Sequence, residues 1–162
     1  MIFVSTGTQL PFDRLIEMVD RIAGELDEEI VVQAKPGKYK PSHFKLLDLI
    51  PTKEFDEYAK RSRLIVAHAG MGIIITAMRL GKPILVLPRL ASLGEHRNEH
   101  QTSTANHLQD MGYVTVVEDY VALKHYVDDD SAVVRHLLSD EVSPGISAFV
   151  AEEIENAVAA KK

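Results

Sequence analysis

Short apolar runs alternate with longer amphipathic stretches along most of the chain. Six apolar runs predict strands over residues 2–5, 30–34, 45–49, 64–67, 84–87 and 114–117, and most of these runs are continuous and rich in Val, Ile and Leu. Continuous apolar runs of this length are typical of strands that are buried on both faces of a parallel sheet.

Helical periodicity fills most of the intervals between these strands. Apolar side chains recur at helical spacing from Phe12 to Ile22, directly after Pro11, a residue that favours a first helical turn. Gly81 and Pro83 follow another apolar helix as a stop signal. The predicted helices cover residues 12–22, 53–61, 72–80, 98–111 and 146–160, and we expect a solvated loop at 128–130. This alternation predicts an α/β fold with an open, doubly wound parallel sheet.

The composition describes one ordinary globular protein. The chain has 162 residues, of which 46% are hydrophobic and 26% are charged, so we expect a single domain over residues 1–162. It contains no cysteine, which excludes disulfide bonds and cysteine-based metal or nucleophile sites. The formal net charge of −6 argues against nucleic acid as a partner through a broad basic face.

Membrane insertion is not indicated by the sequence. No apolar run approaches the roughly 20 residues that a membrane span requires. The N-terminus has no basic segment of the kind that opens a signal peptide. We therefore expect a cytoplasmic domain without a membrane span.

Two of the loops that follow predicted strands are suited to anions, and in this fold class ligands bind at such loops. In the first loop, Thr6, Gly7 and Thr8 precede a helix, whose free N–H groups and positive end favour a phosphate; a simple threonine cap is the alternative. The second loop, residues 68–72, contains two glycines that allow a ligand close to the backbone, with a plain tight turn as the alternative. Two such loops in one domain predict a diphosphate ligand.

Neither of the common phosphate-binding motifs is present in the second loop or after the helix that follows it. Ile75 stands where the third glycine of a dinucleotide fingerprint is required. The pair Gly81-Lys82 is followed by Pro83 rather than Ser or Thr, so it is not a P-loop.

The third loop, residues 88–101, is long and dense in functional groups, as functional loops often are. Arg89 and Arg97 are candidates to face a phosphate. Asn98 and Gln101 offer amides of the kind that bind sugar hydroxyls. A solvated helix start is the alternative interpretation.

One segment of this loop also matches a zinc motif. The spacing of His96, Glu99 and His100 fits the H-x-x-E-H pattern, in which two histidines bind zinc and the glutamate acts as a base. The segment follows a strand of a small parallel sheet and lacks a third ligand. A zinc hydrolase is therefore a minor alternative.

Taken together, the loops resemble a known family. The start Thr6-Gly7-Thr8 and residues 11–15, 66–72, 80–83, 88–89, 95–101 and 108–112 are similar to the C-terminal half of glycosyltransferase family 28. They resemble its stand-alone branch, which includes the catalytic subunit of the eukaryotic N-acetylglucosaminyl-diphosphodolichol transferase. That branch also includes bacterial subunits that add the second sugar of exopolysaccharide or capsule precursors, and the sequence at 88–101 is similar to these. The resemblance extends over residues 1–125.

The resemblance implies a division of labour between two subunits. Complete members have two Rossmann-like domains in the GT-B arrangement, and this chain would supply the half that holds the UDP-sugar donor. The lipid-linked saccharide acceptor would be held by a membrane-anchored partner, which would recruit this chain to the inner face of the membrane. The implied reaction is an inverting transfer of a hexose or N-acetylhexosamine.

The resemblance also assigns roles to individual residues. It places Thr6, Gly7 and Thr8 in the first phosphate loop, Gln101 at the donor sugar, and Ile50 or Pro51 near the uracil edge. The second phosphate loop would consist of His68, Ala69, Gly70, Met71 and Gly72. Many relatives have an acidic residue for the ribose hydroxyls where this chain has Thr76, whose hydroxyl can bind only one of them.

Catalysis in such a site requires a general base and a stabilised leaving group. Glu95, His96, Glu99 and His100 are the candidate bases in this chain, and the partner is the alternative source. No acidic pair lies beside the loops, so we expect no metal or other cofactor, with the UDP-sugar as a substrate. A non-catalytic nucleotide-sugar-binding subunit is the second reading of the same loops.

Overall fold

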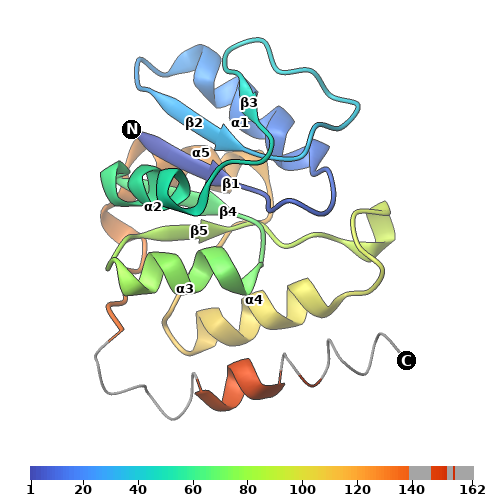
Figure 1. The fold of residues 1–162 in the computed structure, drawn as a ribbon, viewed down its shortest axis with the longest axis vertical. Helices are drawn as coiled ribbons and strands as arrows, with labels where there is room; N and C mark the ends of the chain where they lie inside the picture. The colour runs from blue at the N-terminus through green and yellow to red at the C-terminus, as the bar shows by residue number, and fades with distance from the viewer. Residues whose placement is uncertain (139–146, 153–154, 156–162) are drawn as a thin grey trace.

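The computed structural model describes residues 1–138, 147–152 and 155. Its centre is a six-stranded sheet with the order β3-β2-β1-β4-β5-β6, in which every neighbouring pair is parallel (Figure 1). The strands are β1 (Ile2–Ser5), β2 (Ile30–Gln33), β3 (Leu46–Leu47), β4 (Leu64–Ala67), β5 (Ile84–Val86) and β6 (Thr115–Val116). The predicted parallel sheet is confirmed, and all six strands lie at their expected places.

Helices cover both faces of the sheet. They are α1 (Asp13–Glu25), α2 (Thr52–Arg61), α3 (Met71–Arg79), α4 (His100–Asp110) and α5 (Tyr120–Asp128), with short 3-10 turns η1 (Ala91–Leu93) and η2 (Asp130–Ala132). One core cluster joins β1 to α1 and α5 through Ile2 and Val4. The other cluster joins the sheet to α2, α3 and α4 and includes Phe3, so successive β1 side chains point to opposite layers.

Several element boundaries differ from the prediction. Helix α4 begins at His100 rather than 98, because the Asn98 side chain accepts a hydrogen bond from the His100 N–H at 3.1 Å and forms a local turn instead. The edge strands β3 and β6 are two residues long and pair on one side only. Asp130, expected in a solvated loop, pairs with Arg63 at 3.2 Å.

Two helical segments lie in the C-terminal region, α5 and residues 147–152. Helix α5 was not among the predicted elements, and its start is capped by Asp119, which accepts a hydrogen bond from the Ala122 N–H at 2.8 Å. Of the helix predicted over 146–160, residues 147–152 are helical, and most of the rest lies outside the described residues. Phe149 stacks on His107 of α4 with ring centroids 5.3 Å apart. No helix in the described part of the chain combines the length and apolar character needed to cross a membrane.

The topology gathers the predicted loops at one edge. Because all strands are parallel, their carboxyl ends meet on one side of the sheet, and the order of strands reverses between β1 and β4. The loops at 6–12, 68–70 and 87–99 follow β1, β4 and β5 on that side. This is the position in which open α/β sheets bind their ligands.

Candidate functional site

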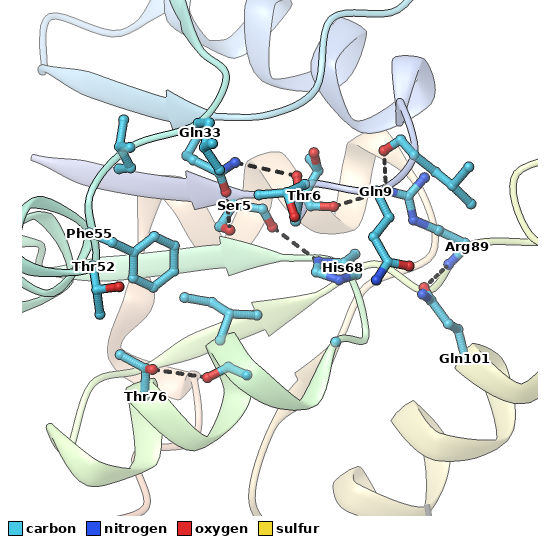
Figure 2. Close-up of a pocket in the computed structure, with 18 of the residues that line it drawn as sticks. Ser5, Thr6, Gln9, Gln33, Thr52, Phe55, His68, Thr76, Arg89 and Gln101 are labelled. Carbon is cyan, nitrogen blue, oxygen red and sulfur yellow. Dashed lines mark hydrogen bonds between the residues drawn. The ribbon is translucent and has the colours of Figure 1, made fainter. Parts of the chain in front are cut away.

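A cavity of about 770 Å³ lies at the carboxyl ends of the strands. Figure 2 shows Arg89 and Gln101 at one end of it, Thr52 and Phe55 at the other, and His68 between them. Its volume is within the range of small-molecule and cofactor sites. The three predicted loops all contribute to its wall.

The first loop turns sharply over the end of β1. Gly7 has a φ of +76°, a conformation that glycine adopts without strain. The Thr6 N–H donates to the Gln33 carbonyl at 3.0 Å, which fixes the loop beside β2. The Thr6 hydroxyl is buried in the cavity wall and has no hydrogen-bond partner among the residues that the structure describes. A buried hydroxyl without a partner is costly, so it marks a place where a ligand atom would be stabilising.

Gln33 at the end of β2 connects the first loop to the segment after β3. Its side-chain oxygen accepts a hydrogen bond from the Ser5 hydroxyl at 2.9 Å. Its amide group donates to the Asp48 carbonyl at 2.7 Å and to the Gly7 carbonyl at 3.3 Å. Sequence reasoning missed this residue, although a buried glutamine at the end of an apolar strand was a signal that could have been used.

The second loop places His68 in the centre of the site. Its Nδ1 lies 3.4 Å from the Ser5 carbonyl, so Nδ1 carries the proton and Nε2 is left as an acceptor. Burial, and then the positive charge of Arg89, lower the pKa of His68 to about 4. The ring is therefore neutral near pH 7.

Helix α3 starts directly behind His68 and has no side-chain cap. Gly70 is its N-cap and has no side chain that could accept a hydrogen bond from the N–H groups of the first turn. Such an uncapped start carries a partial positive charge and suits an anion. Gly70 and Gly72 line the cavity, whereas Ala69 and Met71 pack against the core cluster below it.

The third loop corrects the expectation for Arg89. Its side chain is buried and donates hydrogen bonds to the carbonyls of Thr6 at 2.9 Å, Leu10 at 2.8 Å and Pro11. Its guanidinium also lies over the Phe12 ring, 4.5 Å from the centroid. Arg89 thus holds the first loop in place, rather than extending a free guanidinium toward a phosphate. Burial lowers its pKa to about 10, so it stays charged beneath the cavity.

Gln101 faces the cavity from the first turn of α4. Its side-chain oxygen accepts a hydrogen bond from the Arg89 N–H at 3.0 Å. The amide NH₂ is then free to donate to a ligand in the cavity that it lines.

The four candidate bases are divided by the structure. His96 lines the cavity. Glu95 lies 2.7 Å from Arg14 in an ion pair and accepts a hydrogen bond from the Leu90 N–H. Glu99 accepts a hydrogen bond from the Ser92 N–H at 3.1 Å, and neither it nor His100 contributes to the wall.

The remaining polar residues of the third loop lie outside the cavity wall. Arg97 and Asn98 do not line it, contrary to expectation. His96 precedes α4 while His100 begins it, so the two histidines do not lie one turn apart on a helix as zinc chelation would require. Within the described residues, no group of three His, Asp or Glu side chains could hold a metal.

The far end of the cavity includes three residues that the sequence analysis did not single out. Phe55, Asp56 and Arg79 line it, and Arg79 pairs with Asp56 at 3.3 Å. Ile50, expected near a uracil edge, is also in this wall. The Thr76 hydroxyl donates to the Gly72 carbonyl at 2.9 Å, within its own helix.

The chain is a Rossmann-like α/β domain with a cavity at the switch point of its sheet, and sequence comparison places it in a family. Residues 1–132 match the glycosyltransferase family 28 C-terminal domain, and the chain belongs to that family. It is similar to the UDP-N-acetylglucosamine transferase subunit ALG13 of Debaryomyces hansenii, with 26% identity over 91 residues. This alignment covers 56% of the chain and 40% of the relative, so the chain spans less than half of that protein.

Solved structures share the fold. The solution structure of ALG13 has a TM-score of 0.58 at 17% identity, covering 86% of this chain and 90% of that one. The glycotransferase of kitacinnamycin has a TM-score of 0.58 at 19% identity, and this chain covers 34% of it. SnogD from Streptomyces nogalater has a TM-score of 0.54 at 21% identity, again with 34% of its length covered. The predicted Rossmann-like half of a GT-B glycosyltransferase is thus confirmed as the fold.

Proposed function

We propose that this chain is the donor-binding, catalytic subunit of a two-part glycosyltransferase. It binds a UDP-sugar and transfers a hexose or N-acetylhexosamine to a lipid-linked saccharide in polysaccharide synthesis. A membrane-anchored subunit holds that acceptor and brings this chain to the inner face of the membrane. Membership of the family, the likeness to a transferase subunit and the cavity at the switch point support this proposal.

The main support for this donor site is the buried Thr6 hydroxyl, which has no hydrogen-bond partner among the described residues. It lies in the same cavity wall as the uncapped start of α3. The donor diphosphate accepts hydrogen bonds from this hydroxyl and from the first N–H groups of α3. The charge of Arg89, buried behind the first loop, adds attraction for an anion. The uridine then extends toward Ile50 and Phe55, and the sugar toward Gln101.

The reaction proposed for this site is a single displacement with inversion. An acceptor hydroxyl attacks the anomeric carbon, the bond from that carbon to the diphosphate oxygen breaks, and the electron pair leaves with UDP. Hydrogen-bond donors fixed around the diphosphate stabilise its developing charge without reorganising. The chain's own donors supply this stabilisation, and the proposal requires no metal or other cofactor.

The acceptor proton needs a base, for which His96 is the candidate in this chain. Its Nδ1 lies 3.2 Å from the Asn98 side-chain oxygen and 3.5 Å from the Asn98 backbone nitrogen, so Asn98 orients the ring in the cavity wall. The other three candidates are engaged elsewhere or lie outside the wall. This observation favours a second candidate function, a nucleotide-sugar-binding subunit whose partner performs the catalysis.

Thr6→Val tests the donor site with little change of shape. We expect the affinity for UDP, measured by calorimetry, to fall about tenfold because a hydrogen bond to a charged group is lost. The unliganded variant should melt at the same or a higher temperature, because a buried hydroxyl without a partner is removed.

Thr115→Val is the matched control. The Thr115 hydroxyl is buried and accepts a hydrogen bond from the Val134 N–H at 3.0 Å, away from the cavity. This variant should lose stability and keep its affinity for UDP. Unchanged UDP affinity in Thr6→Val would contradict the proposed diphosphate position.

A further inference from the structure

A lysine-rich loop connects Gln33 to Leu49, two residues that line the cavity. The segment between β2 and β3 carries Lys35, Lys38, Lys40 and Lys45, all exposed, and residues 33–50 contain a single acidic residue, Asp48. None of the ion pairs in the described part of the chain involves these lysines. The whole chain has a formal net charge of −6, so this loop is a positive region on an acidic protein.

The loop is held firmly from below. Asp20 of α1 is buried and accepts hydrogen bonds from the Tyr39 hydroxyl at 2.8 Å and from the N–H groups of Ser42 at 3.0 Å and His43 at 2.9 Å. Asp13, at the start of α1, accepts another from the Lys38 N–H at 3.0 Å. The backbone is therefore fixed while the lysine side chains are exposed, and the Lys40 ammonium donates to the Gly37 carbonyl at 3.2 Å.

Exposed leucines accompany the lysines at this edge. Leu49 is 79% exposed and Leu10 is 42% exposed, and both line the cavity. The Ala34 N–H donates to the Leu47 carbonyl at 2.9 Å, which brings the start of the loop beside the segment that carries Leu49. Figure 1 shows this loop projecting beside α1, at the edge of the molecule. Lysines around exposed leucines form the kind of surface that rests in a lipid headgroup region.

We propose that Lys35, Lys38 and Lys40 with Leu49 form a contact surface for an anionic phospholipid membrane. Positive charge on one edge and negative charge elsewhere orient the chain so that the cavity rim approaches the bilayer. The choice of a membrane rather than an acidic protein rests on the proposed function, in which the acceptor sugar is attached to a lipid. This contact acts in addition to recruitment by a partner subunit.

Vesicle co-sedimentation of the full chain tests the surface. We expect binding at low ionic strength to phosphatidylcholine vesicles that contain phosphatidylglycerol, no binding to phosphatidylcholine alone, and release on adding salt. Lys35→Gln with Lys38→Gln should lower the partition coefficient about 25-fold, at about fivefold for each lysine. Both side chains are exposed, so the variant should melt as the parent chain does.

Lys60→Gln with Arg61→Gln is the matched control. Lys60 and Arg61 are the last two residues of α2, which packs on the opposite face of the sheet from α1. The two substitutions remove the same amount of positive charge as Lys35→Gln with Lys38→Gln. The control should change vesicle binding by less than about twofold. An equal loss in both variants, or no binding of the parent chain to anionic vesicles, would overturn the proposal.

Two further measurements separate this inference from others. UDP affinity in solution should be unchanged in Lys35→Gln with Lys38→Gln; a parent chain that binds vesicles but not UDP would overturn the proposed function alone. A third outcome is that the parent chain does not bind vesicles, while Lys35→Gln with Lys38→Gln no longer binds a co-expressed membrane-anchored subunit. The loop would then bind protein, and the membrane contact would be refuted.

Discussion

The ring of His68 lies between two glycines of the site. A Cβ atom added at Gly7 would lie 3.1 Å from His68 Cε1, and one added at Gly70 would overlap His68 Nε2. Gly70 itself has an ordinary φ of −93°, so space rather than backbone conformation requires a glycine there. We expect bulk at this position to displace the His68 ring first and, through it, to disturb the proposed diphosphate position.

Gly70→Ala should therefore reduce the affinity for UDP about tenfold, the effect of losing one hydrogen bond to a charged group. The decisive comparison is a double-mutant cycle measured by calorimetry. In a His68→Ala background the ring is absent, so the added methyl should cost little further affinity. A tenfold loss in both backgrounds would show that the methyl obstructs the ligand directly, and a thermal melt of each variant checks its fold.

Some residues of the site could be predicted from the sequence and others could not. Hydroxyls and glycines directly after a strand carry a local signal, so Thr6, Gly7 and Gly70 were expected in the wall. Phe55 and Arg79 come from helices whose own patterns show only an amphipathic surface. The bonds of Arg89 to the first loop depend on the order of the strands, which brings residues about 80 positions apart into contact.

At the scale of elements, hydrophobic periodicity predicted a helix or strand correctly where one continuous face of that element is buried. Helix α4 starts late because a polar side chain, Asn98, offers the backbone a competing hydrogen bond. Strands β3 and β6 lie at the edges of the sheet and each pairs with one neighbour, so each is short. The length of an apolar run in the sequence does not show how many of its residues pair with another strand. Helix α5 is short and buries only Leu123 and Val127 among its residues, so its helical period is weak in the sequence.

Helix α1 acts as the support of the lysine-rich loop through Asp20. Burial opposes the charged form, but hydrogen bonds from His43, Ser42 and Tyr39 outweigh it and lower the pKa of Asp20 below its ordinary 3.8. The folded state thus favours the carboxylate. Its contribution to stability is complete above about pH 3.8 and is lost as the pH falls through the lower pKa of the folded state.

Asp20→Asn should lower the free energy of unfolding at pH 7 by about 1–3 kcal/mol. The amide NH₂ of asparagine is a donor, so it cannot accept the hydrogen bonds that one carboxylate oxygen of Asp20 accepts. Urea unfolding at pH 7 and near pH 3 measures the change. The difference between parent and variant should shrink at the lower pH, where the parent carboxyl also begins to protonate. Glu17→Gln on the exposed face of α1 is the control and should stay within about 0.5 kcal/mol; a pH-independent difference would contradict the role of the carboxylate.

At the scale of the whole molecule, the site occupies one edge of one sheet and leaves apolar surface beside it. Leu49 and Leu10 are exposed on the cavity wall. Leu93, in the loop after β5, is also exposed. The fold class followed from the alternation of elements, whereas the position of this surface follows from the strand order and the packing of the loops.

The last prediction concerns the division of labour. We expect the purified chain to bind UDP yet transfer little sugar to a lipid-linked acceptor, and to gain at least about 100-fold in rate when a membrane-anchored partner is co-expressed. The reason is that misplacing the acceptor by about 1 Å can cost a rate factor of that size. In the assembled enzyme, Gln101→Glu keeps the acceptor oxygen for the Arg89 N–H but removes the amide donors, and it should lower transfer about tenfold. Unchanged transfer in that variant would favour the accessory subunit, and full activity of the single chain would refute the two-part arrangement.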